Sequence, residues 1–308
     1  MNSQQFFTFI FTAAVIWGCS GGDSDSHVGE TSLDDTESST PDTGSVETDA
    51  HDSDTGTDSQ SDADYTEGAD VDPNIIYESD TQFTLEWKDD FAAFDAARWM
   101  RATHTFDENE ATFTSNNVVF EDGFMKLLIT AGEGTQKPYN AGELRTIDFF
   151  TYGRFETRAK FAAGSGLISS LFTFYDHWAD AAMEENWNEI DIEFLGRDEN
   201  SLQYNEIVWN DQNQRVTNEF HDTLDFQPSA EFHVYAIEWT PAGIGFYIDG
   251  ELRHQSDTYA AQMVLPQRIM MNAWPTNQSG WAGDIDEAAL PATAYYDWVK
   301  YYSYNDAK

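Results

Sequence analysis

Three carboxylates alternate with apolar residues along one short stretch of the chain. Glu189, Asp191 and Glu193 are separated by Ile190 and Ile192. Successive side chains of a β-strand point to opposite faces, so the three carboxylates share one face if this stretch is a strand. Like charges so close together repel, and at least one of the three is expected to have a raised pKa. One protonated and one ionised carboxyl is what glycoside hydrolysis requires.

The spacing of the outer two carboxylates bears on the stereochemistry of such a reaction. Glu189 and Glu193 are four residues apart, so their Cα atoms lie about 13 Å apart along a strand. Retaining enzymes hold the two carboxyl groups about 5–5.5 Å apart, and inverting enzymes about 6.5–9.5 Å. Two glutamates that lean together across a concave sheet close much of the gap, with Asp191 between them to relay hydrogen bonds. Spacing alone leaves both outcomes open.

The same alternation would also suit a solvent-facing strand with a buried apolar side. On the opposite face stand Asn188, Ile190, Ile192 and Phe194, three of them apolar and expected to face the core. Trp187 lies on the acidic face, and a solvated face rarely carries an indole. Aromatic rings stack on sugars, so Trp187 favours a binding cleft over a plain surface.

The elements that must position these residues are short β-branched and aromatic runs separated by turn signals, from about residue 82 to 302. Asp249 and Gly250 form one such hairpin signal. Long amphipathic helices are absent. The pattern predicts an all-β fold of two packed antiparallel sheets, a jelly-roll sandwich, in a single domain over residues 81–308. The expected strands are Gly153–Phe161, Ser169–Phe174, His233–Trp239, Ile244–Ile248, Glu251–His254, Arg268–Trp274 and Thr293–Tyr302.

Charge narrows the class of partner. The formal net charge is −41, and no Lys or Arg precedes Lys88. Of the 56 acidic residues, 17 fall within residues 1–72, so the remainder of the chain is strongly acidic as well. A negative field repels nucleic acid and sulfated polysaccharides. A neutral polymer fits better, and we expect no nucleic acid partner.

The N-terminal region predicts export and tethering. Phe6–Trp17 is too short to span a bilayer and is typical of a signal-peptide core. Cys19 is the only cysteine, which excludes an intramolecular disulfide, and it follows the stretch as in a bacterial lipoprotein cleavage box. We expect a signal peptide over residues 1–19 and a lipid anchor on Cys19 that holds the protein on a bacterial membrane at the cell surface. An ordinary secretion signal is the alternative. Residues 20–80, rich in Asp, Ser and Thr, predict a solvated linker rather than a calcium-binding repeat.

The segment from Glu189 to Gly196 resembles the signature of glycoside hydrolase family 16, whose concanavalin-like jelly roll carries a concave substrate cleft. The uninterrupted motif is typical of the family's lichenases (β-1,3-1,4-glucanases) and of its xyloglucan endotransglycosylases, and the resemblance covers roughly residues 85–302. It implies a retaining endo-hydrolase with Glu189 as nucleophile, Glu193 as general acid/base and Asp191 assisting.

The resemblance also implies a set of substrate-binding side chains. Asn272 and Trp274 share one face of a predicted strand by their spacing alone. Phe172 and Trp274 could instead be core residues, and Glu143 with Arg145 an ordinary ion pair. The residues given a binding role by the resemblance are Glu143, Arg145, Phe172, Trp187, Asn205, Asn272, Trp274 and Trp281.

Lichenases of this type hold a structural calcium ion through one Asp carboxylate and main-chain carbonyls. The matching positions are Asp297 for the carboxylate and Asp90 and Gly123 for the carbonyls; oxygen ligands suit calcium. A buried Asp297 bonded to a turn is the alternative. Phe174 and Ile207 stand where many lichenases have cleft tyrosines, which weakens the inference of mixed-linkage preference.

Taken together, these features predict a monomeric enzyme that hydrolyses mixed-linkage β-1,3-1,4-glucan without a catalytic cofactor. Alternatives on the same fold are a β-1,3-glucanase, a transglycosylase that intercepts the same intermediate, and a hydrolase of sulfated galactans. A non-catalytic β-glucan-binding protein is a further alternative, although such proteins usually lose a catalytic carboxylate and all three are present here.

Overall fold

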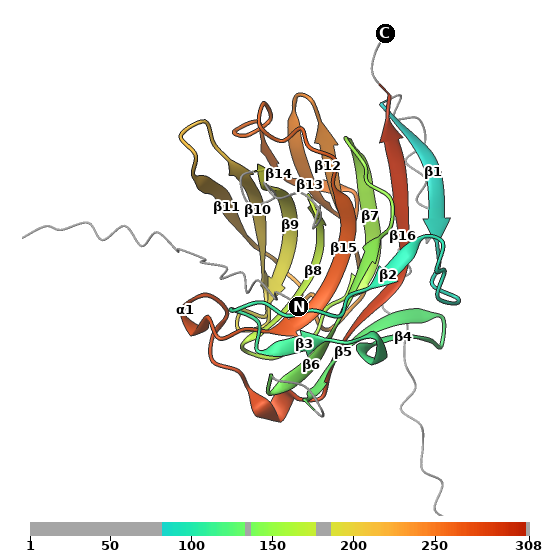
Figure 1. Cartoon of the computed structure of the whole chain (residues 1–308), viewed down its shortest axis with the longest axis vertical. Coiled ribbons are helices and arrows are strands. Elements are labelled where there is room, and N and C mark those ends of the chain that lie inside the picture. Colours follow the sequence, from blue (N-terminus) through green and yellow to red (C-terminus); the bar gives the residue numbers. More distant parts are fainter. Residues whose placement is uncertain (1–81, 133–136, 177–185, 306–308) are drawn as a thin grey trace, which may run out of the picture. The chain divides into compact units, whose positions relative to one another are not determined.

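The structure is a computed structural model that describes residues 82–132, 137–176 and 186–305. Regular structure in these ranges is mainly β-strand (Figure 1). The earlier strands are β1 (Phe83–Asp89), β2 (Trp99–Arg101), β3 (Ala111–Phe113), β4 (Val118–Glu121), β5 (Phe124–Ala131), β6 (Tyr139–Thr146), β7 (Gly153–Lys160) and β8 (Leu167–Phe174). The later strands are β9 (Asn188–Leu195), β10 (Ser201–Trp209), β11 (Arg215–Thr223), β12 (His233–Thr240), β13 (Gly243–Ile248), β14 (Glu251–Ser256), β15 (Arg268–Pro275) and β16 (Ala292–Tyr304).

The helical elements are short. They are η1 (Ser115–Asn117), α1 (Ser279–Ala282) and η3 (Glu287–Ala289). In the part of the chain that the structure describes, no helix has the length and apolar character needed to cross a membrane.

The strands form one long hydrogen-bonded series that curves into two layers. Its order is β11-β10-β9-β8-β15-β6-β5-β16-β7-β12-β13-β14, with β1 on β16, β2 and β3 on β6, and β4 on β5. Among these ladders, only β3 with β6 is parallel. Figure 1 shows the half that contains β9, β8 and β15 in front of the half that contains β12 and β13.

The core lies between these two halves. Leu171 of β8 and Ile192 of β9 belong to the same buried apolar cluster as Tyr235 and Ile237 of β12, and all four side chains are fully buried. Period-two alternation puts one face of each strand into this core. The opposite face of the β11–β6 half is therefore left to form a surface of its own.

The turn between β13 and β14 fixes the register of these two strands. Asp249 and Gly250 have φ values of 47° and 82° between β13 and β14, the left-handed conformations that a two-residue hairpin of this kind requires. Asp249 also accepts a hydrogen bond from the backbone N–H of Val234 at 2.8 Å, which ties the turn to β12.

The predicted fold class is confirmed. The strands expected over His233–Trp239 and Arg268–Trp274 are present as β12 and β15 with ends within one residue. All described ranges fall within the domain predicted over residues 81–308. The predicted signal peptide, Cys19 and the linker over residues 20–80 lie outside the described residues.

Candidate active site

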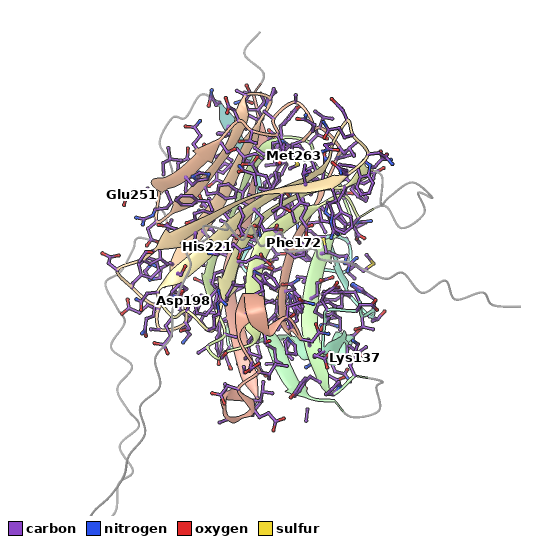
Figure 2. All side chains as sticks on the ribbon, turned by 90° about the vertical axis from the view of Figure 1, so that its left-hand side faces the viewer. Lys137, Phe172, Asp198, His221, Glu251 and Met263 are labelled. Carbon is purple, nitrogen blue, oxygen red and sulfur yellow. The ribbon has the colours of Figure 1, made fainter. Side chains whose placement is uncertain are left out.

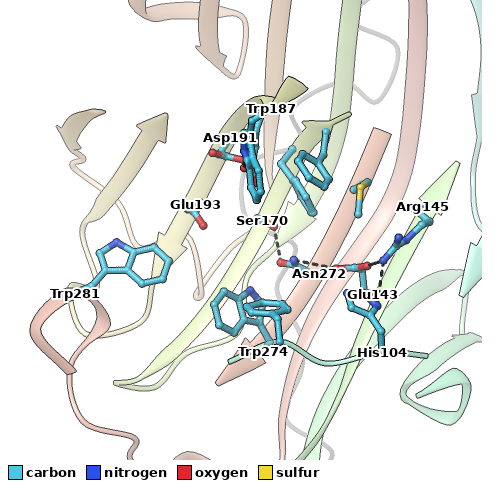
Figure 3. A pocket seen from close by; sticks show the side chains of 15 residues that line it. His104, Glu143, Arg145, Ser170, Trp187, Asp191, Glu193, Asn272, Trp274 and Trp281 are labelled. Atoms are coloured by element: carbon cyan, nitrogen blue, oxygen red, sulfur yellow. Dashed lines mark hydrogen bonds and ion pairs between the residues drawn. The ribbon is translucent and has the colours of Figure 1, made fainter. Parts of the chain in front are cut away.

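The three alternating carboxylates lie on one face of β9. Ile190 and Ile192 between them are fully buried in the core, whereas Glu189 and Glu193 remain partly exposed. The two glutamates therefore face the same side of the sheet, opposite the core, as the alternation predicted. Figure 3 shows the close view of the cleft into which this face opens.

Strand pairing places another carboxylate, Glu143, three strands away from Glu193 across the sheet. Glu193 pairs with Ser170 on β8, Ser170 with Asn272 on β15, and Asn272 with Glu143 on β6. These four side chains form a row perpendicular to the strands, and three strand spacings extend it over roughly 14 Å. The cleft thus crosses the strands, so that a polymer lying in it meets residues from β9, β8, β15 and β6 in turn.

Burial raises the pKa of all three carboxyl groups of β9. Burial raises the pKa of Glu189 to about 7, opposed by the Trp187 hydrogen bond and by the charge of Arg215. Burial and the neighbouring charge of Glu189 raise the pKa of Glu193 to about 8. The pKa of Asp191 lies well above its ordinary value, because it is buried between the other two. Near neutral pH the site can therefore hold protonated and ionised carboxyls side by side.

Each glutamate has a different hydrogen-bond donor. Trp187 Nε1 donates to Glu189 Oε2 at 2.7 Å. Asn205 Nδ2 donates to Glu193 Oε2 at 2.8 Å from the neighbouring strand β10. A donor to a carboxylate favours its ionised form and also fixes its rotamer. The two bonds therefore orient the pair as well as tuning it.

Glu143 and Arg145 form one end of the cleft and are both nearly buried. An Arg145 guanidinium nitrogen, Nη2, contacts Glu143 Oε1, and the same nitrogen lies 3.3 Å from His104 Nδ1. Arg145 Nη1 donates to Asp176 Oδ2 at 2.6 Å. The pair is thus an ion pair and part of the cleft lining at once.

The imidazole of His104 has a defined role in this cluster. Burial lowers the pKa of His104, which favours a neutral ring near neutral pH. Since Arg145 can only donate, Nδ1 is the accepting nitrogen and we assign the proton to Nε2. Asn272 continues the network, because its Nδ2 lies 3.4 Å from Glu143 Oε2 and its Oδ1 accepts from Ser170 at 2.6 Å. Figure 3 draws these bonds.

Aromatic side chains line both sides of the carboxylates. Phe172 and Trp187 belong to one apolar cluster, and Trp274 packs with Phe106 and Trp281 in another. Phe106 meets Trp274 edge-on, with ring centroids 5.0 Å apart. Phe172 is 7% exposed and Trp274 is 5% exposed, so each is mostly buried and yet contributes to the cleft surface.

The structure brings most of the predicted binding residues together. Asn205 adjoins the cleft through Glu193. The other seven line the cleft itself and are Glu143, Arg145, Phe172, Trp187, Asn272, Trp274 and Trp281.

Several residues of the cleft have no counterpart in the sequence-based prediction. His104 and Phe106 line it from the segment between β2 and β3, and Ser170 and Met270 line its floor. Asp176 forms an ion pair with Arg145. Period two could have found Ser170 and Met270, which share strand faces with Phe172 and Asn272; the irregular segment that holds His104 offers no such signal.

The positions predicted for calcium lie away from this cleft. Asp297 on β16 accepts a hydrogen bond from Arg158 at 2.8 Å, so the one carboxylate of the predicted donor set already has a cationic partner. Over the described ranges, no group of three or more His, Cys, Asp or Glu side chains could hold a metal ion. The predicted donor set combines the Asp297 carboxylate with the main-chain carbonyls of Asp90 and Gly123, and it stays a prediction from the resemblance.

Comparison with known proteins shows the family. The sequence model described as glycosyl hydrolases family 16 matches residues 105–300. A protein named Beta-glucanase from Brevibacillus brevis is 40% identical over 214 residues, which are 68% of this chain and 79% of that protein.

Solved structures show the same similarity. A prokaryotic β-1,3-1,4-glucanase (lichenase) derived from a mouse hindgut metagenome superimposes with a TM-score of 0.63 at 32% identity, over 70% of this chain and 97% of that one. The laminarinase catalytic domain from Thermotoga maritima MSB8 shares the fold with a TM-score of 0.63 at 20% identity, over 73% of this chain and all of that one. With the family model matched across the cleft strands and the carboxylates of β9 in place, this chain belongs to glycosyl hydrolase family 16 and is a glycoside hydrolase of the β-glucanase type.

Proposed function

We propose that the protein is a retaining endo-β-glucanase that hydrolyses mixed-linkage β-1,3-1,4-glucan. The observation that carries the proposal is the placement of Glu189 and Glu193 on one cleft-facing side of β9, four residues apart, each with its own hydrogen-bond donor. The preference for mixed linkages is supported by the 32% identity to a lichenase.

In the first step Glu189 acts as the nucleophile. Its ionised carboxylate attacks the anomeric carbon and forms a glycosyl ester, while Glu193 gives its proton to the departing glycosidic oxygen and the carbon–oxygen bond breaks. Glu189 is the better candidate for the ionised partner, because the Trp187 donor and the charge of Arg215 both favour its anion. Glu193 has the higher pKa of the two, so it is the carboxyl that keeps a proton to donate near neutral pH.

In the second step Glu193 acts as a base instead of an acid. Glu193, now ionised, accepts a proton from water, whose oxygen attacks the anomeric carbon and displaces Glu189. Two displacements restore the original β configuration. Asp191, whose pKa lies well above its ordinary value, stands between the two and can carry a hydrogen bond to either.

The cleft suits internal cleavage of a neutral chain. Its lining extends from the catalytic strand β9 across β8, β15 and β6, and Asn205 of β10 adjoins Glu193 on the other side, so several consecutive sugars of one chain can be bound. Phe172, Trp187 and Trp274 supply apolar faces for sugar rings, and Glu143, Arg145 and Asn272 supply hydrogen-bonding groups. The strongly acidic chain disfavours sulfated substrates.

The site of action follows from the N-terminal sequence. We infer export and attachment to a bacterial membrane through Cys19, with residues 20–80 as a spacer between the membrane and the catalytic domain. Metabolic labelling with a fatty acid tests this: wild-type protein should carry the label and Cys19→Ala should not.

The test of activity is a panel of barley β-glucan, lichenan, laminarin, xyloglucan and cellulose, with linkage analysis of the products. The expected result is release of reducing sugars from the two mixed-linkage glucans, abolished in Glu189→Ala while binding to the polymer survives. Faster cleavage of laminarin would make the enzyme a β-1,3-glucanase. Longer products from a defined oligosaccharide would make it a transglycosylase.

A further inference from the structure

The edge strand β11 carries opposite charges toward the catalytic strand. Its pairing with β10 sets Arg215 opposite Trp209 and Glu219 opposite Asn205. Arg215 and Glu219 are four residues apart and share a face, as Glu189 and Glu193 do on β9. Figure 1 shows β11 at the border of the layer, and Figure 2 views the molecule from that side, with His221 labelled on the strand.

Arg215 is connected to Glu189 through an indole. The guanidinium carbon lies 4.7 Å from the ring centroid of Trp187, a cation–π geometry. The Nε1 atom of the same indole donates to Glu189. A cation on the ring makes the N–H a stronger donor, and its charge also acts directly on Glu189, lowering its pKa.

Glu219 is connected to Glu193 through two amides. Its Oε2 lies 3.3 Å from Gln203 Nε2, which also donates to Asn205 Oδ1 at 3.0 Å, and Asn205 donates to Glu193. Its other oxygen lies 2.8 Å from His221 Nε2. The carboxylate of Glu219 is therefore held by both oxygens, and its negative charge raises the pKa of Glu193.

The other charged groups around the pair do not distinguish its members in this way. Asp191 lies between Glu189 and Glu193 on β9 and repels both, and Glu143 on β6 acts on Glu189 with a sign opposite to that of Arg215. The side chains that β8, β10 and β15 bring to the row beside Glu193 are neutral, namely Ser170, Asn205 and Asn272. Arg197 and Asp198 line a small hollow together with His221.

We propose that Arg215 and Glu219 are positioning residues that bias the catalytic carboxyls in opposite directions, Arg215 keeping Glu189 ionised and Glu219 keeping Glu193 protonated. The inference rests on the proposed retaining mechanism, because it assigns the two charges to a nucleophile and an acid. It predicts that the edge strand widens the pH range in which the pair is correctly protonated.

The test measures kcat/KM on barley β-glucan against pH, at low ionic strength, for Arg215→Gln and Glu219→Gln. Arg215→Gln should raise the apparent pKa of the acidic limb by about 0.2–0.7 unit, and Glu219→Gln should lower that of the alkaline limb by a similar amount, as for partly exposed charge pairs. Arg215→Lys and Glu219→Asp keep the charges, so the apparent pKa of each limb should return most of the way to its wild-type value. High salt should reduce both shifts.

Matched controls are Lys88→Gln on β1 and Glu251→Gln on β14, which remove the same charges from exposed positions outside the cleft. Their profiles should superimpose on the wild type. The inference is overturned if the limbs of the Arg215 and Glu219 variants do not move, move as in the controls, or if activity falls equally at every pH. A wild-type protein inactive on every glucan would instead overturn the proposed function.

Discussion

Trp187 Nε1 donates a 2.7 Å hydrogen bond to Glu189 Oε2, so the indole that lines the cleft also contacts the proposed nucleophile. Trp187 lies directly before β9 begins at Asn188, two positions from Glu189. Trp187 therefore both lines the cleft and affects the ionisation of Glu189.

Removing that donor should affect the acidic side of the pH profile. In Trp187→Phe the ring remains and the N–H is lost, so the anion of Glu189 loses a stabilising bond and its pKa rises. We expect the acidic limb of kcat/KM to move to higher pH, with a modest change in KM because the ring face is kept. The measurement is kcat and KM across pH; an acidic limb that stays in place would contradict the role given to the bond.

The wild-type profile itself should be bell-shaped and narrow. Activity requires Glu189 ionised and Glu193 protonated, with pKa values of about 7 and about 8. The rate should therefore fall below about pH 7 as Glu189 gains its proton and above about pH 8 as Glu193 loses its own. These limbs belong to the coupled pair rather than to isolated residues. Constant activity from pH 4 to 6 would contradict the raised pKa of Glu189.

Ionisation of Glu193 should destabilise the folded protein at high pH. The folded-state pKa of Glu193 is raised above the value of an ordinary glutamate, so its contribution is fully present below about pH 4.5 and is lost as pH rises through about 8. Glu193→Gln cannot ionise and should melt at least about 2 °C above wild type at pH 9, since ~1 kcal/mol corresponds to 2–4 °C in a domain of this size.

The same comparison at pH 4.5 should show no difference in melting temperature. Glu251→Gln, an exposed glutamate on β14, provides the control and should match wild type at both pH values. Equal melting of Glu193→Gln and wild type at pH 9 would count against the raised pKa.

Loss of the acid should depend on the leaving group. Glu193→Gln should lower kcat/KM on β-glucan by about 10²–10⁴, the range typical of general acid–base groups. An aryl β-glucoside oligomer with an acidic phenol needs little protonation, so its first step should be nearly preserved. The measurement is the burst of phenol release, and equal losses on both substrates would remove Glu193 from the role of acid.

Calcium removal should have little effect on the folded domain. Asp297 already pairs with Arg158, so a chelator should leave the melting temperature within about 2 °C of the untreated protein. Arg158→Ala frees the carboxylate and should make the melting temperature more responsive to added calcium. A large loss of stability on chelation in the wild type would show instead that the predicted site binds metal despite the ion pair.

The parts of the site that sequence predicted are those encoded within one strand. Alternation along β9 gave the shared face of Glu189, Asp191 and Glu193, and alternation along β15 gave that of Asn272 and Trp274. Short apolar runs with turn residues gave the strands, and the Asp249-Gly250 turn took the expected conformation. Each of these features depends on neighbours within a few residues.

The remaining parts depend on contacts between distant segments. His104 reaches Arg145 from an irregular segment, and Asp176 reaches it from the end of β8. Arg215 reaches Trp187 and Glu219 reaches Gln203 because of the β10–β11 register. Such pairings follow from how strands order themselves in the sheet, which no local pattern encodes.

The central claim is that Glu189 forms a covalent bond to the sugar, and trapping that bond tests it most directly. An oligo-β-glucosyl fluoride with fluorine at C2 forms the ester and slows its hydrolysis, so mass spectrometry of the digested protein can locate the sugar. The account predicts one added oligosaccharide on the peptide that contains Glu189, absent in Glu189→Gln. Rapid turnover to the α-anomer with no adduct, or an adduct on another carboxylate, would contradict it.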